Sequence, residues 1–151
     1  MIEGIKTKKL KMAVDERGRL MEILRSDDNE FIKFGQVYIT TNNPGVVKAW
    51  HLHKVQIDYV ACVKGTIKLA IHDPRDGSPT RGQTDEFIIG EHNPVLVVIP
   101  PGVYHGWMNI GDTESIVVNA PTEVYNYDKP DEFRLPYNSP EIPYSWEIKH
   151  G

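Results

Sequence analysis

Three residues near the middle of the chain have types and spacings that could support chemistry. His51 and His53 lie two positions apart, and Asp58 follows five positions after His53. Side chains two positions apart in a β-strand point to the same face, so both imidazoles are expected on one face. If the chain turns within 54–57, the carboxylate can approach them. Such a group can bind a divalent first-row metal ion, transfer a proton or serve only the fold.

A fourth candidate is His105, which follows the turn-forming sequence PPG at 100–102. Closure of a sheet into a barrel brings strands that are distant in sequence together, so His105 can face the other histidines. An isolated H-x-H on a strand is more often solvated or satisfied within a core, and that alternative stays open. The metal hypothesis is one divalent ion, of unidentified element, with four protein ligands: His51, His53, Asp58 and His105.

The elements that must position these residues read as short strands separated by turns. Apolar or alternating runs predict strands at 20–24, 35–41, 46–53, 58–63, 66–72, 86–89, 95–99, 104–109 and 115–120. Turn sequences such as NNPG, VKGT and IGDT separate them. Helical periodicity is scarce, and only SDDNEFIKF at 26–34 predicts a brief helical turn. The pattern predicts one all-β domain over 1–151, an antiparallel sandwich or barrel.

The remainder of the chain adds three structural expectations. The stretch from Asp128 to the end is rich in proline and aromatic residues, which predicts an irregular tail packed on the barrel. Its aromatic residues are too apolar to remain in solvent: Phe133, Tyr137, Tyr144 and Trp146. Cys62 lies in an apolar run and is expected as a small core residue. Three further histidines are expected at the surface or in turns: His72, His92 and His150.

Composition limits the class of function. A chain of 151 residues suits one domain, and a net charge of −4 argues against a nucleic-acid surface. Hydrophobic content is ordinary, so no membrane span is expected. A lone cysteine cannot form an internal disulfide, and the segment MIEGIKTKKLKM lacks the apolar core of a signal peptide. A cytoplasmic protein is therefore expected.

The histidine spacing resembles the two sequence motifs of the cupin superfamily. Residues 45–65 fit G-x5-H-x-H-x4-E-x6-G with Asp58 at the glutamate place, and residues 100–109 fit P-x-G-x2-H-x3-N. The leading glycine of the second motif falls on Pro94. The resemblance implies a jelly-roll fold, and in metal-binding cupins the four corresponding places are the ligands.

Other segments resemble one cupin branch, the dTDP-4-dehydrorhamnose 3,5-epimerases and their relatives. DERGRLME at 15–22 is similar to D-x-R-G-x-F-x-E, and HDPRDGSPTRGQ at 72–83 to D-x-R-x-x-S-P-T-x-G. IPPGVYHGW at 99–107 and SPEIPYSW at 139–146 are similar to two further family segments. The resemblance covers most of the chain. It implies a homodimer that takes a nucleotide sugar as its small-molecule partner and needs no organic cofactor.

The resemblance also implies roles for individual residues. His51 matches the histidine that removes the proton alpha to the sugar ketone, His105 matches a second site histidine, and Tyr125 is the nearest retained tyrosine that could act as the acid. Substrate contacts are implied for five residues: Arg17, Glu22, Gln36, Lys48 and Arg75. Trp107 is a further candidate, because it lies beside the histidines and can stack on a base or sugar. The segment with Arg17 and Glu22 would reach the nucleotide in the partner subunit. Packing for Tyr125 and Trp107, and a turn salt bridge for Arg75, remain alternatives.

Several family positions differ here. The family lysine falls on Asp58, the acid tyrosine on Asn119, and the aspartate that pairs with the basic histidine near Ser139. Strict strand alternation would point Lys48 away from His51, so a shared role requires a β-bulge or a twist. A metal ion could replace the lysine in stabilising an enolate. A metal-ligated His51, however, could not act as a free base.

The predicted function is an isomerase or epimerase that deprotonates a nucleotide-linked 4-keto-6-deoxy sugar alpha to its ketone. A neutral imidazole is well suited to that step near neutral pH. The H-x-H pair mildly favours a ketoisomerase. Two alternatives belong to other classes: a metal-dependent cupin enzyme of another reaction type, and a non-catalytic protein that only binds a sugar nucleotide.

Overall fold

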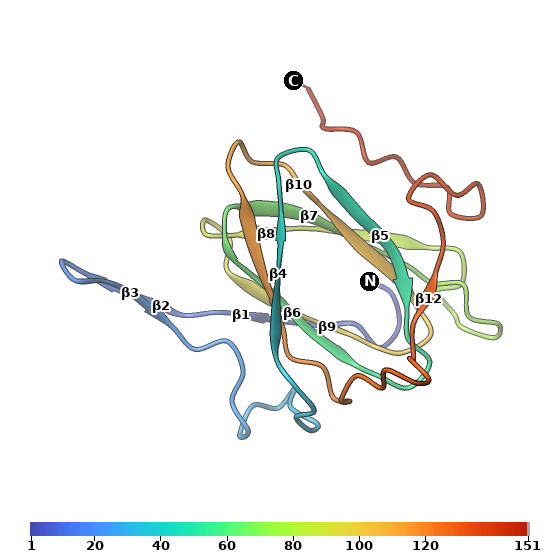
Figure 1. Ribbon diagram of the computed structural model, residues 1–151, viewed down its shortest axis with the longest axis horizontal. Coiled ribbons are helices and arrows are strands. Elements are labelled where there is room, and N and C mark those ends of the chain that lie inside the picture. Colours follow the sequence, from blue (N-terminus) through green and yellow to red (C-terminus); the bar gives the residue numbers. More distant parts are fainter. Residues whose placement is uncertain (151) are drawn as a thin grey trace.

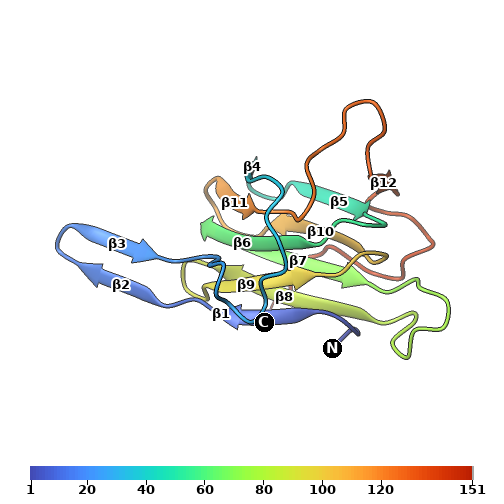
Figure 2. The ribbon, with the colours of Figure 1, turned by 90° about the horizontal axis from the view of Figure 1, so that it is seen from below.

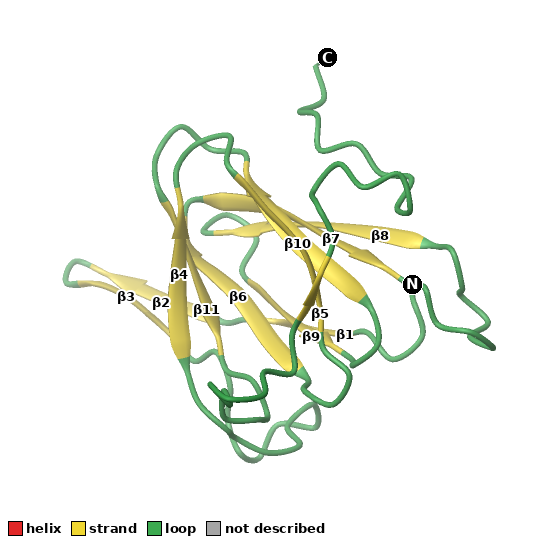
Figure 3. Cartoon of the chain, turned by 45° about the vertical axis from the view of Figure 1, so that its right-hand side comes forward, coloured by secondary structure: helices red, strands yellow, loops and turns green. Residues whose placement is uncertain are grey.

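The computed structural model describes residues 1–150 and consists of strands, turns and irregular segments, with no helix in that range (Figure 3). The prediction of an all-β chain is confirmed. A helix of the length and apolarity needed to cross a membrane is likewise absent from these 150 residues. The strands are β1 (Lys6–Lys9), β2 (Met12–Asp15), β3 (Gly18–Met21), β4 (Tyr38–Asn42), β5 (Val47–Leu52), β6 (Asp58–Lys64), β7 (Thr66–His72), β8 (Thr84–Gly90), β9 (Val95–Ile99), β10 (Tyr104–Asn109), β11 (Ser115–Asn119) and β12 (Phe133–Arg134).

Two five-stranded sheets face each other across the interior (Figures 1 and 3). The first sheet has the order β1-β9-β6-β11-β4 and the second the order β12-β5-β10-β7-β8. Strands far apart in sequence thereby become neighbours, as β5 and β10 do in an antiparallel pair. This arrangement is the antiparallel sandwich that the strand pattern predicted, in the jelly-roll form that the family resemblance implied.

The core between the sheets comes from strands whose apolar pattern is evident in the sequence. Ile67, Leu69 and Ile71 alternate along β7 and are fully buried, together with Val60 of β6 and Val97 of β9. Alternate side chains of a strand share a face, so this face is fixed toward the opposite sheet. Polar side chains replace the apolar ones where β4 and β11 face β5 and β10, and a cavity lies there.

A β-bulge in β5 orients two of the cavity residues. His51 pairs with His105 and Lys48 pairs with Trp107, so two residues of β5 oppose the single Gly106 of β10. The extra residue lets Lys48 and His51, three positions apart, both line the cavity. This is the irregularity that a shared role of the two residues required. A Cβ atom on Gly106 would lie only 2.3 Å from the Ala49 Cβ, so the close approach of the strands requires glycine here.

The two ends of the chain extend the barrel in different ways. β1 joins the edge of the first sheet beside β9, whereas β2 and β3 form a separate hairpin that projects away from the barrel (Figure 2). The C-terminal tail packs on the outer face of the second sheet, where Ile142 and Trp146 are buried against Trp50. The packed tail is confirmed for these residues, but Phe133 and Tyr137 remain exposed.

Some element predictions were wrong. Residues 26–34 form turns and irregular chain instead of a helical turn. The Asp28 carboxylate accepts a hydrogen bond from the Arg25 backbone and pairs with Lys8, and a single turn is too short to be stable as a helix. The strand expected at 35–41 begins only at Tyr38, because the Gly35 backbone N–H donates to the Pro121 carbonyl. The strand expected at 20–24 is shifted to β3, while β1, β2 and β12 were not predicted.

Candidate active site

A cavity of about 500 Å³ lies between the two sheets, within the size range of small-molecule sites. The second sheet supplies one wall and the first sheet the facing wall, and loops complete the mouth. The second-sheet residues are Lys48, His51, His105, Trp107 and Arg134, the first-sheet residues are Tyr38, Thr40 and Asn119, and the others include Gln36, His53, Tyr125, Tyr127 and Glu132.

His51 forms a pair with a carboxylate that the sequence did not indicate. Its Nδ1 lies 3.0 Å from Glu132 Oε1, which also accepts a hydrogen bond of 2.9 Å from Arg134. A carboxylate only accepts, so Nδ1 carries the proton and Nε2 is left as the basic nitrogen. Burial and the charge of His105 lower the pKa of His51, and together they outweigh the opposite effect of Glu132. His51 is therefore neutral and available as a base near neutral pH.

A second group joins His53, Asp58 and His105. The Nε2 atoms of His53 and His105 lie 3.4 and 3.2 Å from Asp58 Oδ2, and the potential ligand atoms of all three residues lie within 4.8 Å of one another. Burial opposes ionisation of Asp58, but the hydrogen bond and charge of His105, with the charge of His53, lower its pKa to about 2. The structure thus brings together three of the four residues expected around a metal ion, and the ring of His51 lies outside this group.

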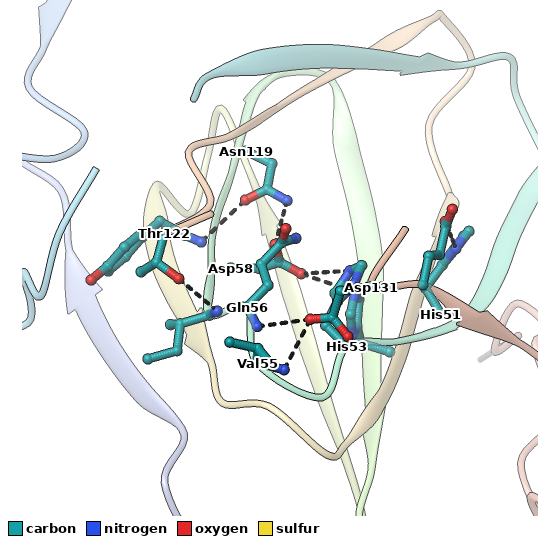
Figure 4. A network of polar contacts seen from close by, with 12 residues as sticks. His51, His53, Val55, Gln56, Asp58, Asn119, Thr122 and Asp131 are labelled. Atoms are coloured by element: carbon teal, nitrogen blue, oxygen red, sulfur yellow. Dashed lines mark hydrogen bonds and ion pairs between the residues drawn. The ribbon is translucent and has the colours of Figure 1, made fainter. Parts of the chain in front are cut away.

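The Asp58 carboxylate is held from its other side by amides (Figure 4). Its Oδ1 atom accepts hydrogen bonds of 2.7 Å from Gln56 and 2.9 Å from Asn119. In contrast, the buried Nδ1 of His105 has no hydrogen-bond partner among residues 1–150. Asp58 is therefore a fixed, charged and buried group, with Oδ2 directed to the two imidazoles.

Asp131 connects the second group to the tail. Its backbone carbonyl accepts a hydrogen bond from Nδ1 of His53, and its carboxylate accepts three more from the backbone of the turn at 54–56, between 2.8 and 3.0 Å (Figure 4). The next residues form β12, which pairs with β5 so that Arg134 lies opposite His51. One short segment, 131–134, thus orients both His51 and His53. Only the long-range pairing of β12 with β5 reveals this, and no local sequence pattern signals it.

The facing wall carries a second polar arrangement. Asn119 Nδ2 donates a 2.9 Å hydrogen bond to the Tyr38 hydroxyl, and Asn119 Oδ1 accepts one of 3.1 Å from the Tyr59 backbone. Burial, assisted by the charge of Asp58, raises the pKa of Tyr38 to about 12. Tyr38 was not predicted as a site residue, although it lies in the strand expected at 35–41, because no local sequence motif marks it.

The other predicted residues at the cavity occupy its mouth and edges. Lys48 Nζ donates to Thr40 Oγ1 at 2.9 Å and to the Thr41 carbonyl at 2.7 Å, which links the two sheets. Gln36 Oε1 accepts a 3.1 Å hydrogen bond from the Tyr125 backbone N–H. The Tyr125 ring packs edge-to-face against Tyr127, with 5.0 Å between the ring centroids.

Three predicted substrate residues do not point into this cavity. Arg17 and Glu22 belong to the projecting hairpin and its exit, where Arg17 pairs with Asp15 and Glu22 pairs with Arg25. Arg75 forms the turn salt bridge that was its alternative, with 2.8 Å between its Nε and Asp73 Oδ1. Trp107 does line the cavity, but it is mostly buried and its Nε1 donates to Asn42.

The expectations for residues outside the site have different outcomes. Cys62 is buried in the core, as predicted, and burial raises the pKa of its thiol to about 11. His72 was expected at the surface or in a turn, but it is buried at the end of β7 with its Nδ1 2.8 Å from Thr84 Oγ1. His92 and His150 are exposed, as predicted. Ser139, near which the carboxylate partner of His51 was expected, instead accepts a hydrogen bond from the Glu141 backbone N–H.

The jelly roll with a polar cavity between its sheets defines the class, a cupin-type protein. Residues 1–150 match the family described as dTDP-4-dehydrorhamnose 3,5-epimerase, and the chain belongs to that family. It is 44% identical over 153 residues to Agl13 of Haloferax volcanii, named as a probable low-salt glycan biosynthesis epimerase, with 99% of this chain and 98% of that protein covered.

Two solved structures support the assignment. A dTDP sugar isomerase from Desulfovibrio desulfuricans G20 matches with a TM-score of 0.91 and 32% identity, covering 96% of this chain and 92% of the other. A dTDP-6-deoxy-D-glucose-3,5-epimerase from Legionella pneumophila, solved in complex with dTDP-4-keto-L-rhamnose, matches with a TM-score of 0.86 and 25% identity, covering 98% and 81%. The chain is thus similar to epimerases of nucleotide-linked keto sugars over nearly its whole length.

Proposed function

We propose that this protein epimerises a nucleotide-linked 4-keto-6-deoxy sugar at a carbon next to the ketone. The observation that carries the proposal is the His51–Glu132 pair, which presents a neutral imidazole to a cavity of suitable size. The ketone acidifies the adjacent C–H bond, and His51 Nε2 removes that proton to leave an enolate. Return of a proton to the opposite face inverts the carbon.

The nature of the substrate follows from the family and from its ligands. The Legionella relative was solved with a dTDP-linked keto sugar, which favours the same chemical class for this chain. An epimerase is favoured over the ketoisomerase that the H-x-H pair suggested, because the family and Agl13 are described as epimerases. The cytoplasm is the proposed compartment, and the single buried cysteine is consistent with it.

The test is solvent-deuterium incorporation. The protein is incubated in D₂O with dTDP- or UDP-linked 4-keto-6-deoxyglucose, and the sugar is followed by proton NMR. We expect deuterium at a carbon next to the ketone, together with the inverted product. His51→Asn should abolish both, whereas the matched control His92→Asn, at an exposed turn, should leave both intact. If the protein binds either substrate but exchanges no hydrogen, its function is that of a non-catalytic sugar-nucleotide-binding protein.

We also propose that His53, Asp58 and His105 hold one divalent cation, with His51 outside the ligand set. A backbone carbonyl can only accept, so His53 Nδ1 carries a proton, and in the neutral ring the Nε2 lone pair faces a carboxylate oxygen 3.4 Å away. A positive charge between these two acceptors removes their mutual repulsion. The hydrogen bond at Nδ1 is also the usual support of a ligating histidine. A cation here would supply a Lewis acid for the ketone oxygen.

Metal content measured by mass spectrometry tests the cation, using untagged protein purified without added metal. We expect close to one ion per chain, lost in Asp58→Asn and kept in His51→Asn. Thermal unfolding with added Mn²⁺ or Zn²⁺ gives a second readout, and only proteins with the site should be stabilised. Failure to bind Mn²⁺, Fe²⁺, Ni²⁺ or Zn²⁺ would contradict the proposal. The positive charge beside Asp58 would then come from a second proton on an imidazole ring.

A homodimer is the proposed functional unit, with Arg17 and Glu22 of one protomer reaching the nucleotide bound by the other. The proposal is supported by the hairpin, whose exposed side chains include Val14 and Leu20, with exposed fractions of 72% and 66%. An isolated two-stranded hairpin is marginally stable in water, so its apolar side chains need a covering surface.

A further inference from the structure

Inversion of a carbon requires a proton donor on the side opposite the base, and the following inference rests on the proposed epimerase function. His51 belongs to the second sheet, so the donor is sought on the first sheet across the cavity. Three first-sheet residues line it: Tyr38, Thr40 and Asn119. An amide is not an acid at any useful pH, and an aliphatic hydroxyl is far weaker than a phenol. Tyr38 is therefore the one first-sheet side chain in the cavity wall that can serve as a general acid.

We propose that Tyr38 is the catalytic acid that delivers a proton to the face opposite His51. The Asn119 side-chain N–H donates to its hydroxyl oxygen at 2.9 Å, so the phenol oxygen is used as an acceptor. Its own proton therefore remains free to be donated into the cavity. Asn119 is itself fixed by the Tyr59 backbone and by Asp58, which makes the position of the phenol reproducible from turnover to turnover.

The hydrogen bond from Asn119 also matches the needs of the product state. When Tyr38 gives up its proton, the phenolate accepts a stronger hydrogen bond from the same amide. Although 40% of the Tyr38 surface is exposed, burial and the charge of Asp58 raise its pKa to about 12. The phenol therefore carries its proton near neutral pH, as an acid opposite a base must.

The other cavity tyrosines are less suited to this step. Tyr125 was the sequence-based candidate, but it lies on a loop and packs against Tyr127, which is 89% exposed. Within residues 1–150 neither hydroxyl has a hydrogen bond that would hold it toward the sugar, whereas Tyr125 is linked to Gln36 through its backbone. These two rings suit contact with the substrate at the cavity mouth.

The proton transfers balance in one turnover. His51 Nε2 takes the proton from the carbon next to the ketone, and the electrons of the broken C–H bond form the enolate. The enolate electrons then form a new C–H bond with the Tyr38 proton on the opposite face, which regenerates the ketone and leaves imidazolium and phenolate. Loss of the first proton and gain of the second through solvent at the cavity mouth restore the starting state.

Tyr38→Phe separates removal of the proton from its delivery. In D₂O the variant should still exchange the hydrogen with retention, because His51 can return a deuteron to the face from which it took the proton. Formation of the inverted product should fall by about 100-fold or more. Tyr104→Phe, outside the cavity, is the matched control and should keep both rates. The variant retains the ring, and its thermal unfolding midpoint checks that it is folded.

Three results would overturn the assignment. Inversion by Tyr38→Phe at the normal rate would mean that the phenol donates no proton. Loss of exchange together with inversion in the folded variant would mean that Tyr38 supports the His51 step instead. Loss of inversion with preserved exchange in Tyr125→Phe, but not in Tyr38→Phe, would return the role to Tyr125. Absence of exchange in the unaltered protein would instead count against the proposed function.

Discussion

At the scale of single residues, Glu132 decides what His51 can do. The carboxylate fixes the imidazole tautomer through Nδ1, so the nitrogen left for the substrate is Nε2. It also offers a negative charge beside the imidazolium that forms when His51 takes a proton. Arg134 holds the same carboxylate oxygen from the other side. Glu132 therefore acts through His51 as a positioning residue.

Replacement of Glu132 by glutamine should slow proton removal with little effect on substrate binding. The amide keeps the size of the side chain but removes the charge and no longer dictates the tautomer. We expect kcat for deuterium exchange to fall by about 10- to 100-fold with KM nearly unchanged. Glu141→Gln, at an exposed tail position, is the control. A change confined to KM would indicate that Glu132 contacts the substrate instead.

Spacing predicted some of these residues and could not predict others. His51, His53 and His105 were found because strand alternation and a proline–glycine turn place them on one face. Glu132 and Asp131 lie 81 and 78 positions from the histidines that they orient, and only tertiary structure joins them. The same holds for Tyr38, whose hydroxyl meets a side chain 81 positions away. A local sequence pattern carries no information about pairs so far apart in the chain.

At the scale of elements, the bulge between β5 and β10 connects strand geometry to the site. Without it, strict alternation would turn Lys48 away from the face that carries His51. The bulge brings the β5 backbone close to Gly106, where the Lys48 carbonyl oxygen would lie 2.8 Å from a Cβ atom. A side chain at position 106 would therefore collide with β5, the strand that carries His51.

Gly106→Ala should destabilise the fold and displace β5. The added methyl would meet backbone and the Ala49 side chain, which cannot move without disturbing the strand pair. We expect a loss of about 1–3 kcal/mol in the free energy of unfolding, measured by urea denaturation. Gly111→Ala is the control, since its Cβ would come no closer than 3.4 Å to another atom. Equal stability of the two variants would show that the strands can separate freely at the bulge.

The strand predictions succeeded and failed for one physical reason. Runs with a clear apolar pattern match closely, such as β9 and β10, which have the predicted bounds. β1 has the sequence KTKK and β12 has only two residues, so neither has an apolar pattern of its own. Both strands lie at sheet edges, where pairing with a neighbour replaces burial as the cause of strand formation.

At the scale of the whole molecule, the projecting hairpin is the feature that supports the proposed dimer. Arg19 anchors it to the barrel through Glu91 at 2.6 Å, but the exposed side chains of Val14 and Leu20 lie on opposite faces of the ribbon. β4 ends the first sheet and exposes Ile39, which offers a second copy an apolar edge. Both features suit a dimer in which the hairpin of one protomer packs on the other.

Leu20→Asp should convert the proposed dimer into monomers. A carboxylate at the centre of an apolar contact would have to be desolvated on association. The molar mass from light scattering should fall by about half at the same protein concentration. Ile148→Asp, in the tail, removes an exposed apolar side chain elsewhere and should leave the mass unchanged. A monomeric starting protein would remove the basis for shared sites.

Complementation between two defective variants tests whether sites are shared across the dimer. Arg17→Ala damages the residue that would reach the partner's cavity, whereas His51→Asn removes the base from its own cavity. The homodimer of each variant should therefore have low catalytic activity. A mixed dimer has one intact site, made of the His51 of one protomer and the Arg17 of the other. After unfolding and refolding of an equal mixture, half of the dimers are mixed, so activity at low substrate concentration should recover to about a quarter of the unaltered level. Recovery no greater than the average of the two variants would place Arg17 outside the partner's site, even if the protein is a dimer.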